Sequence, residues 1–276
     1  MGAATVAPST RTGTPVLALD GISKRFGAVQ ALSDVHFEAH AGEVVALVGD
    51  NGAGKSTLVK IISGVGPADE GQILFQGRPV DIPNPHASQH LGIATVFQDL
   101  ALCDNLDVVA NLFLGNEALR RGRLDEATME KRSADLLAEL SARLPDVRLP
   151  VASLSGGQRQ TVAICRSLLG DPRLIALDEP TAALGVAQTA GVLNLIEQLR
   201  RRGLAVVLIS HNMADVFAVA DRVSVLRLGR NAGEFRVGQT TNEEVVAAIT
   251  GATDNVVAQR ARRGADQSGP EPEGPR

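Results

Sequence analysis

The sequence predicts an α/β fold built around a parallel sheet, and three of its segments lead to that prediction. A glycine-rich loop at residues 49–56 lies between the apolar run 44–48 and a helical stretch at 58–63. The apolar run 174–177 has the character of a buried strand and ends in two adjacent carboxylates. Beyond residue 185, helical and strand patterns alternate, which favours parallel strands with helices on their faces.

The glycine-rich loop has the composition of a phosphate-binding loop. Its glycines allow successive backbone N–H groups to turn inward around anionic phosphates, because a side chain there would block the turn or the close approach. Lys55 supplies a point charge for the terminal phosphates, and the Ser56 hydroxyl can ligate Mg²⁺. The flanking strand and helix patterns disfavour the alternative of a merely glycine-rich turn. A nucleotide is therefore expected to contact Gly49, Asp50, Asn51, Gly52, Ala53, Gly54, Lys55, Ser56 and Thr57.

The two carboxylates, Asp178 and Glu179, lie at the carboxyl end of their predicted strand. Ligands of open α/β sheets bind at that end of the strands. Asp178 is placed to hold Mg²⁺ directly or through water, and Glu179 to polarise the water that attacks a γ-phosphate. The alternative is that these carboxylates simply form a charged strand end that faces solvent. The presence of a phosphate-binding loop in the same chain disfavours that alternative.

A second glycine-rich segment, Leu154 to Gln160, precedes another helical pattern. Ser155 is expected to be the N-cap, and the glycines at 156 and 157 leave bare N–H groups that make a second anion site. One nucleotide does not need two phosphate cradles from one protomer. Each cradle is therefore expected to close on the nucleotide of a partner, which predicts a head-to-tail homodimer with two shared sites.

Strand patterns near the phosphate-binding loop predict an antiparallel part that joins the parallel sheet. They lie at residues 16–19, 35–38, 44–48 and 72–75. Beyond residue 185 the patterns predict a helix at 186–201, a strand at 204–209, a helix at 212–220, a strand at 223–226 and a closing helix near 242–249.

From residue 107 to about residue 143 the pattern changes to helix, with Asp125 as a cap and apolar residues at helical spacing. We expect a helical subdomain at about 100–170 that carries the second glycine pair. The arginine-rich stretch 120–123 is expected to be a loop, and the arginines at 200–202 to end a helix.

The phosphate-binding loop, the segment LSGGQ and the segment LIALDEP occur in an order that resembles the ATP-binding cassette (ABC) family. The resemblance extends over nearly all of residues 16–250. It implies a P-loop NTPase (RecA-like) parallel sheet core, an antiparallel β subdomain and a helical subdomain with the signature motif. It also implies that ATP, bound with Mg²⁺, closes two cassettes on each other and that the closed dimer hydrolyses the ATP.

The resemblance implies roles for further residues. Gln98 resembles the glutamine that contacts Mg²⁺ and water and senses the transmembrane partner, and His211 the histidine that touches the γ-phosphate. Phe26 lies where the family places an aromatic ring on adenine. Each residue also has an alternative interpretation. Phe26 could be an ordinary core residue, and Gln98 and His211 could be solvated polar residues at strand ends. The implied metal ligands are Ser56, Gln98 and Asp178, and the residues expected to act on the partner's ATP are Ser155, Gly156, Gly157 and Gln158.

Gly185 departs from the family pattern, because most members have an aspartate there that helps couple the two ATP sites. A glycine cannot make that side-chain hydrogen bond. Hydrolysis is still expected, since Asp178 and Glu179 are intact. The strength of communication between the sites is left open.

Length and composition limit the number of domains and the kinds of partner that the chain can have. The 276 residues, 44% of them hydrophobic, suffice for one cassette at 15–251, and the polar segments 1–14 and 252–276 are expected to be disordered tails. The formal net charge of −4 gives no reason to expect a nucleic-acid partner. No apolar stretch approaches the roughly 18 residues of a membrane span. Cys103 and Cys165 are expected to be reduced thiols.

The resemblance is closest to ATPase subunits of monosaccharide importers of the ribose, xylose and fructose type. It implies separate integral-membrane permease subunits, an extracytoplasmic solute-binding protein, and a cytoplasmic location on the inner face of the membrane. The alternative is a soluble cassette ATPase in DNA repair or translation. The short interval between Gln98 and Ser155 and the single cassette argue against that alternative. The sequence leaves open which sugar is carried.

Overall fold

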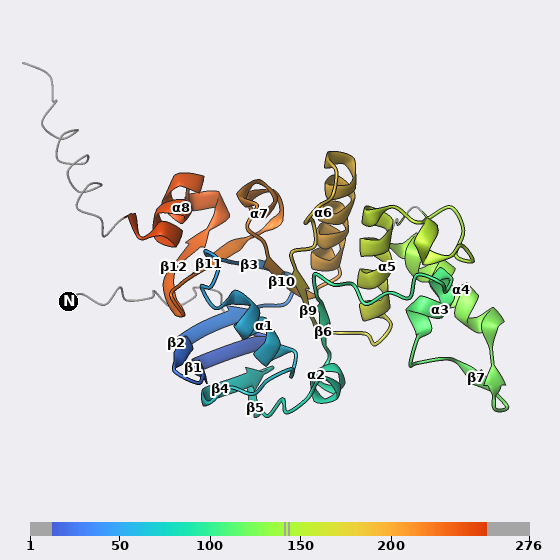
Figure 1. Ribbon diagram of the computed structural model, residues 1–276, viewed down its shortest axis with the longest axis horizontal. Coiled ribbons are helices and arrows are strands. Elements are labelled where there is room, and N and C mark those ends of the chain that lie inside the picture. The colour runs from blue at the N-terminus through green and yellow to red at the C-terminus, as the bar shows by residue number, and fades with distance from the viewer. Residues whose placement is uncertain (1–12, 141, 143, 253–276) are drawn as a thin grey trace, which may run out of the picture.

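The computed structural model describes residues 13–140, 142 and 144–252. Apart from residues 13, 14 and 252, the two predicted tails lie outside the described residues. The described chain forms two larger sheets, one above the other in Figure 1, with a group of helices at one end.

The central sheet has six strands in the order β12-β11-β3-β10-β9-β6. The five strands from β11 to β6 are parallel, and only β12 is antiparallel to its neighbour, as the alternating patterns predict. All residues of β3 and β10 are buried, which is typical of parallel strands covered on both faces. The strands are β3 Val44–Val48, β6 Ile93–Val96, β9 Leu174–Asp178, β10 Ala205–Ile209, β11 Arg222–Arg227 and β12 Arg230–Arg236.

The second sheet is antiparallel, in the order β2-β1-β4-β5, and confirms the predicted antiparallel part. Its first two strands form a longer hairpin than the sequence predicts, because bulges between Leu19 and Lys24 interrupt the apolar alternation without ending the pairing. The strands are β1 Leu17–Phe26, β2 Val29–Ala39, β4 Glu70–Phe75 and β5 Arg78–Val80.

Two apolar cores lie on opposite faces of the central sheet, because successive side chains of a strand point to opposite sides. Val45 and Leu47 of β3 pack into one core with Leu58 of α1 and the antiparallel sheet. Val44 and Ala46 pack into the other with the helices that follow. The helix α1, Lys55–Ile62, begins three residues earlier than its apolar pattern, directly at the lysine of the glycine-rich loop.

The remaining helices cover the central sheet and its end. After the edge strand β6, the chain forms a group of three helices, α3, α4 and α5, at the right of Figure 1. Asp125 accepts a hydrogen bond from the N–H of Thr128 and is the predicted cap of α4. These elements are α2 Pro85–Leu91, α3 Val108–Phe113, α4 Glu126–Glu139, η1 Val151–Ser153, α5 Gly156–Leu168, α6 Val186–Arg201, α7 Met213–Val219, η2 Val237–Gln239 and α8 Asn242–Thr250.

The prediction of a loop at residues 120–123 is wrong in one respect. The chain between α3 and α4 forms a two-stranded hairpin of β7, Leu119–Arg120, and β8, Arg123–Leu124. Its turn residues Arg121 and Gly122 both have positive φ, 52° and 78°. Such turns match the twist of the strands that they join, which explains why this arginine-rich stretch forms a hairpin. Within the described residues, no helix is long and apolar enough to cross a bilayer.

Candidate functional site

The glycine-rich loop joins β3 to α1 and presents the start of that helix. Gly54 precedes α1 with φ at 106°, and no side chain caps the helix. A Cβ on Gly54 would lie 2.6 Å from Leu32 Cδ2 and 2.9 Å from Ala31 O, so only glycine fits. The uncapped N–H groups and the helix dipole therefore make a cradle for an anion.

Lys55 lies inside this cradle. Its side chain is buried, and Nζ donates hydrogen bonds to the carbonyl oxygens of Gly49, at 2.7 Å, and Asp50, at 3.0 Å. The ammonium is thereby held at the centre of the loop, where it can meet a phosphate with little loss of side-chain entropy. The exposed Ser56 hydroxyl follows it at the first turn of α1.

Asp178, the last residue of β9, lies close enough to Lys55 to feel its charge. Burial raises the pKa of the Asp178 carboxyl above its usual range, and the charge of Glu179 raises it further, while the Lys55 ammonium acts in the opposite direction. Glu179 has a φ of 50°, a conformation that costs roughly 1–3 kcal/mol outside glycine. Its N–H donates to Ile209 O at 2.9 Å, so the turn is held by the neighbouring strand β10.

This turn directs Glu179 toward His211, which follows β10. Glu179 Oε2 and His211 Nδ1 are 2.8 Å apart, and the imidazole is 73% exposed whereas the carboxylate is 16% exposed. Adjacent parallel strands bring both residues to the same edge of the sheet, as Asp178 pairs with Ile209 in register. The pair offers a base next to a group that can donate a hydrogen bond to a phosphate oxygen.

The signature segment begins α5, on the face of the central sheet opposite to α1. Ser155 is the N-cap, as predicted, and exchanges hydrogen bonds with Gln158 in a capping box. A Cβ on Gly157 would lie 2.8 Å from Gln188 Cβ of α6, so the glycine is also needed for packing. The loop that ends at Gly185 therefore lies directly against the signature. The backbone N–H of Gly185 donates to Gln188 Oε1 at 3.4 Å.

Phe26 and Gln98 are both exposed. Phe26 is 55% exposed at the tip of the β1–β2 hairpin, opposite Val29, with Lys24 Nζ 5.6 Å from its ring centroid. The alternative that Phe26 is ordinary core is therefore wrong, and its ring is available for stacking. Gln98 follows the edge strand β6.

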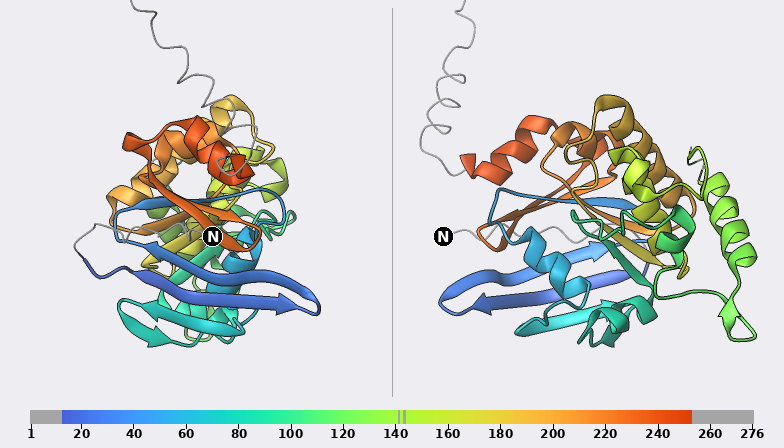
Figure 2. Two further views of the ribbon diagram at one scale, coloured as in Figure 1. Left: turned by 90° about the vertical axis from the view of Figure 1, so that its left-hand side faces the viewer. Right: turned by 45° about the vertical axis from the view of Figure 1, so that its right-hand side comes forward.

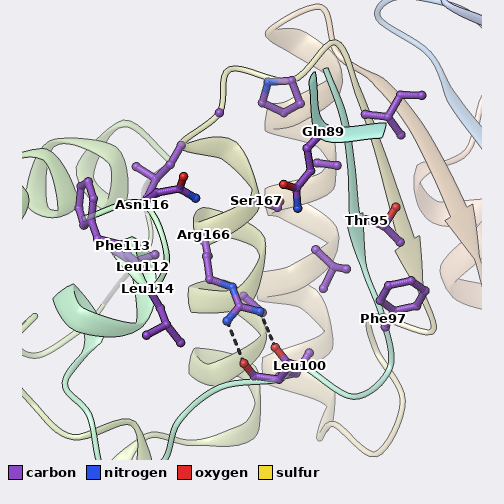
Figure 3. A pocket seen from close by; sticks show the side chains of 18 of the residues that line it. Gln89, Thr95, Phe97, Leu100, Leu112, Phe113, Leu114, Asn116, Arg166 and Ser167 are labelled. Atoms are coloured by element: carbon purple, nitrogen blue, oxygen red, sulfur yellow. Dashed lines mark hydrogen bonds between the residues drawn. The ribbon is translucent and has the colours of Figure 1, made fainter. Parts of the chain in front are cut away.

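A groove of about 720 Å³ adjoins the segment that follows Gln98. It lies between α2 and β6 on one side and α3 and α5 on the other, and Figure 3 shows Arg166 of α5 reaching the backbone of this segment. The Arg166 guanidinium donates to the carbonyl oxygens of Leu100 and Ala101, both at 2.8 Å. Burial lowers the pKa of this guanidinium. Arg166 thus ties the Gln98 segment to the signature helix.

The sequence did not single out Arg166, Thr181 or Asp215. Asp215 is buried in α7, and its Oδ2 accepts a hydrogen bond of 2.6 Å from Thr181 Oγ1. Asp215 is a carboxylate in the first turn of a helix, and such residues usually need no explanation beyond the helix dipole. No local signal distinguishes it, because its partner lies on another loop.

The residues expected to hold a divalent cation all carry oxygen donors. Ser56, Asp178 and Gln98 offer hydroxyl, carboxylate and amide oxygens, which suit Mg²⁺. In the part of the chain that the structure describes, no three His, Cys, Asp or Glu side chains form a metal cage. That donor set fits a cation bound largely through substrate phosphates.

The chain matches one family model, described as "ABC transporter", over residues 32–182. It is 44% identical to the fructose import ATP-binding protein FrcA of Rhizobium meliloti, with 87% of this chain and 95% of the relative covered. It is 43% identical to the xylose/arabinose import ATP-binding protein XylG of Sulfolobus acidocaldarius, with 85% and 94% covered. A ribose import ATP-binding protein RbsA of Clostridium perfringens is 39% identical, and the match covers 48% of its length.

Solved structures agree with this match. A nucleotide-free ATP-binding cassette from an ABC transporter has a TM-score of 0.74 and 28% identity, with 86% of this chain and 95% of that chain covered. A dimeric cassette in a post-hydrolysis state bound to ADP and Pi has a TM-score of 0.68 and 26% identity, with 80% and 98% covered.

Proposed function

Because the chain belongs to the ABC transporter family, we propose that it is the ATP-hydrolysing subunit of an importer and energises uptake of a monosaccharide through separate permease subunits. The observation that carries this proposal is the contact between Glu179 and His211 beside the phosphate-binding loop. The names of the relatives, which are import ATP-binding proteins for fructose, xylose or arabinose, and ribose, support the sugar class. The names of the relatives do not favour the alternative, a soluble cassette ATPase in DNA repair or translation.

The hydrolytic step follows from the positions of the side chains. Lys55 and the N–H groups at the start of α1 hold the terminal phosphates of ATP. Glu179 takes a proton from the attacking water. In the imidazolium form both ring nitrogens of His211 donate, Nδ1–H to Glu179 and Nε2–H toward the γ-phosphate. Phe26 stacks on the adenine. Ser56, Asp178 and Gln98 would hold Mg²⁺, which when bound would supply positive charge to neutralise the phosphate oxygens.

Two protomers complete each site. Ser155, Gly156, Gly157 and Gln158 lie at the start of α5, on the sheet face opposite to α1. We infer that they cover a partner's ATP and not the ATP of their own protomer. Closure excludes water from the phosphates and strengthens each electrostatic contact there. Hydrolysis then removes the charge that holds the homodimer closed.

The groove beside Gln98 is the proposed docking place for a permease. Its wall includes the exposed Leu114, and the Arg166 hydrogen bonds link the Gln98 segment to α5. A permease segment in the groove would therefore contact both the ATP-sensing segment and the helix that carries the signature. An extracytoplasmic binding protein would deliver the sugar to the permease, and the cassette would lie on the inner face of the membrane.

Replacement of Glu179 tests the chemical part of this proposal. Glu179→Gln should slow ATP turnover by about 10²- to 10⁴-fold while leaving ATP binding nearly intact. It should also accumulate a dimer in ATP and Mg²⁺, measured by size-exclusion chromatography with light scattering. The exposed Glu243→Gln is the matched control and should turn over ATP at the normal rate. Normal turnover in Glu179→Gln would remove Glu179 as the base.

Co-purification tests the transport part. Tagged Glu179→Gln protein, taken from its native membranes in ATP and Mg²⁺, should bring down a multi-spanning permease. Adding Leu114→Asp should abolish this capture, whereas adding Val246→Asp on α8 should not. Ribosomes or nucleic acid in place of any membrane protein would overturn the importer assignment.

A further inference from the structure

Within residues 13–252, as far as the structure describes them, two pairs of exposed apolar residues face each other across strands. Phe26 and Val29 form one pair at the tip of the β1–β2 hairpin, and the ATP site uses it. Leu119 and Leu124 form the other, on the β7–β8 hairpin, with 66% and 56% of their surfaces exposed. Cross-strand partners lie on the same face of a ribbon, so these two leucines make a joint apolar surface. Nothing in the hydrolytic site uses this second surface.

The rest of the hairpin is cationic. Arg120 and Arg123 are also a cross-strand pair, and Arg121 occupies the turn between them. All three are exposed, and none of their side chains forms an ion pair or hydrogen bond with a described residue. By contrast, Arg148 of the adjoining segment pairs with Glu130 at 2.6 Å, and Arg200 on α6 pairs with Glu197 at 2.7 Å. The three hairpin arginines are therefore available to an external anion.

The carboxylates that flank the hairpin in sequence form hydrogen bonds or ion pairs with residues outside the hairpin. Glu117 accepts a hydrogen bond from the N–H of Gly115, and Asp125 caps α4. Glu126 pairs with Arg148 at 3.4 Å. The tip itself thus carries unbalanced positive charge. Like charges directly opposite each other destabilise a ribbon, so this composition does not favour the hairpin by itself, and a bound anion would relieve the repulsion.

We propose that the β7–β8 hairpin binds the surface of an anionic phospholipid bilayer. The leucine pair enters the boundary between headgroups and acyl chains, and the long arginine side chains reach the lipid phosphates around it. A bilayer surface presents anions and an apolar layer side by side. A nucleic acid would satisfy the arginines and leave the leucines in water, so the combination on this hairpin favours the bilayer.

The position of the hairpin agrees with this assignment. In Figures 1 and 2, which are related by rotation about the vertical axis, the hairpin and α2 both reach the lower edge of the molecule. Residues of α2 form one wall of the groove proposed for the permease. In this respect the inference rests on the proposed function: a permease docked in the groove would place that edge nearest to the membrane.

Vesicle sedimentation of the full chain tests the inference directly. Wild-type protein should sediment with vesicles of phosphatidylcholine and phosphatidylglycerol at a 3:1 ratio and remain in solution with phosphatidylcholine alone. Loss of one arginine should weaken binding about fivefold, and Arg120→Gln/Arg121→Gln/Arg123→Gln about 10²-fold. Leu119→Ser/Leu124→Ser should weaken it by at least about tenfold at constant charge. Raised salt should weaken wild-type binding and affect the arginine variant less.

The matched control is Arg200→Gln/Arg201→Gln/Arg202→Gln, which removes the same charge elsewhere and should bind vesicles like the wild type. Unchanged ATP binding shows that each variant is folded. Equal binding by the hairpin and control variants, or no binding of wild type to anionic vesicles, would overturn the inference. Loss of permease capture with no loss of vesicle binding in the hairpin variants would also overturn it, since the hairpin would then contact the permease.

The two proposals fail separately. Hairpin-dependent vesicle binding without any permease in the membrane pull-down leaves the lipid site standing and removes the importer assignment. Permease capture through the groove, without vesicle binding, supports the importer assignment and removes the lipid site.

Discussion

Thr181 Oγ1 donates a hydrogen bond of 2.6 Å to Asp215 Oδ2, and this bond joins the loop after Glu179 to the helix after His211. The contact between Glu179 and His211, at 2.8 Å, joins the same two segments a few residues earlier. Two side-chain contacts therefore hold the candidate base and its partner in one geometry. We propose that Asp215 is a positioning residue, because among the described residues its side-chain hydrogen bond is to Thr181.

Removal of the Thr181–Asp215 bond should lower kcat with little change in KM, since ATP is held by the other loop. Thr181→Val keeps the shape of the side chain and removes the donor, and it should lower kcat by about tenfold, equivalent to a hydrogen bond to a charged group. Thr181→Ser and Asp215→Asn keep a donor and an acceptor and should restore most of the rate. Steady-state ATPase kinetics would measure both constants. A rise in KM alone would place this bond outside the hydrolytic geometry.

His211→Ala should slow hydrolysis by roughly 10²-fold and leave ATP affinity nearly unchanged, because it removes a hydrogen-bond donor and the partner of Glu179. The exposed His90→Ala is the control and should have a normal rate. If the two residues act as a unit, Glu179→Gln/His211→Ala will be no slower than Glu179→Gln alone. Additive losses in single-turnover assays would indicate independent roles.

Gly157→Ala should impair the ATP-induced dimer and leave binding of ATP to each protomer intact. The added Cβ would lie 2.8 Å from Gln188 Cβ and push the start of α5 away from α6. Gly191→Ala on α6 provides the contrast, because no atom lies within 4 Å of its new Cβ. That change should raise the free energy of unfolding by up to about 1 kcal/mol, the difference in helix propensity. Light scattering and chemical denaturation would separate the two outcomes.

Asp178 should make the free protein less stable as pH rises. Burial raises its pKa in the fold above the ordinary value of 3.8, so the folded state binds the proton more tightly than the unfolded state. The free energy of unfolding should therefore fall as pH rises from about 4 through the raised pKa. Asp178→Asn should remove this part of the pH dependence and also the stabilisation by Mg²⁺ with ATP. Thermal unfolding at several pH values, with and without Mg²⁺, would measure both effects. A Mg²⁺ effect that persists in the variant would exclude Asp178 as a ligand.

Cys165 should resist alkylation in the native protein, because burial raises the pKa of its thiol to about 12. Cys103 is only partly buried and should react first. Denaturation should expose both thiols equally, which mass spectrometry after iodoacetamide treatment can count. Rapid labelling of native Cys165 would show that α5 opens locally.

The local chemistry of the site follows from the sequence alone. Three short patterns predict it: a glycine loop before a helix, a serine before a glycine pair, and two carboxylates after an apolar strand. Each pattern can be recognised within a few residues. Ser155 is therefore the N-cap as predicted, and Lys55 lies within a loop that can hold an anion. The βα alternation after Gly185 likewise predicts the parallel sheet, since each crossover needs a helix.

Only the tertiary structure decides which of these segments meet. Glu179 contacts His211 because β9 and β10 are neighbours in the central sheet, and strand order does not follow from strand pattern. For the same reason, no local signal distinguishes Asp215 from an ordinary first-turn acid. Phe26 is exposed, and Leu119 faces Leu124, because hairpin register determines which side chains are left unburied. Local propensities act over a few residues, whereas these pairings depend on the free energy of packing distant segments together.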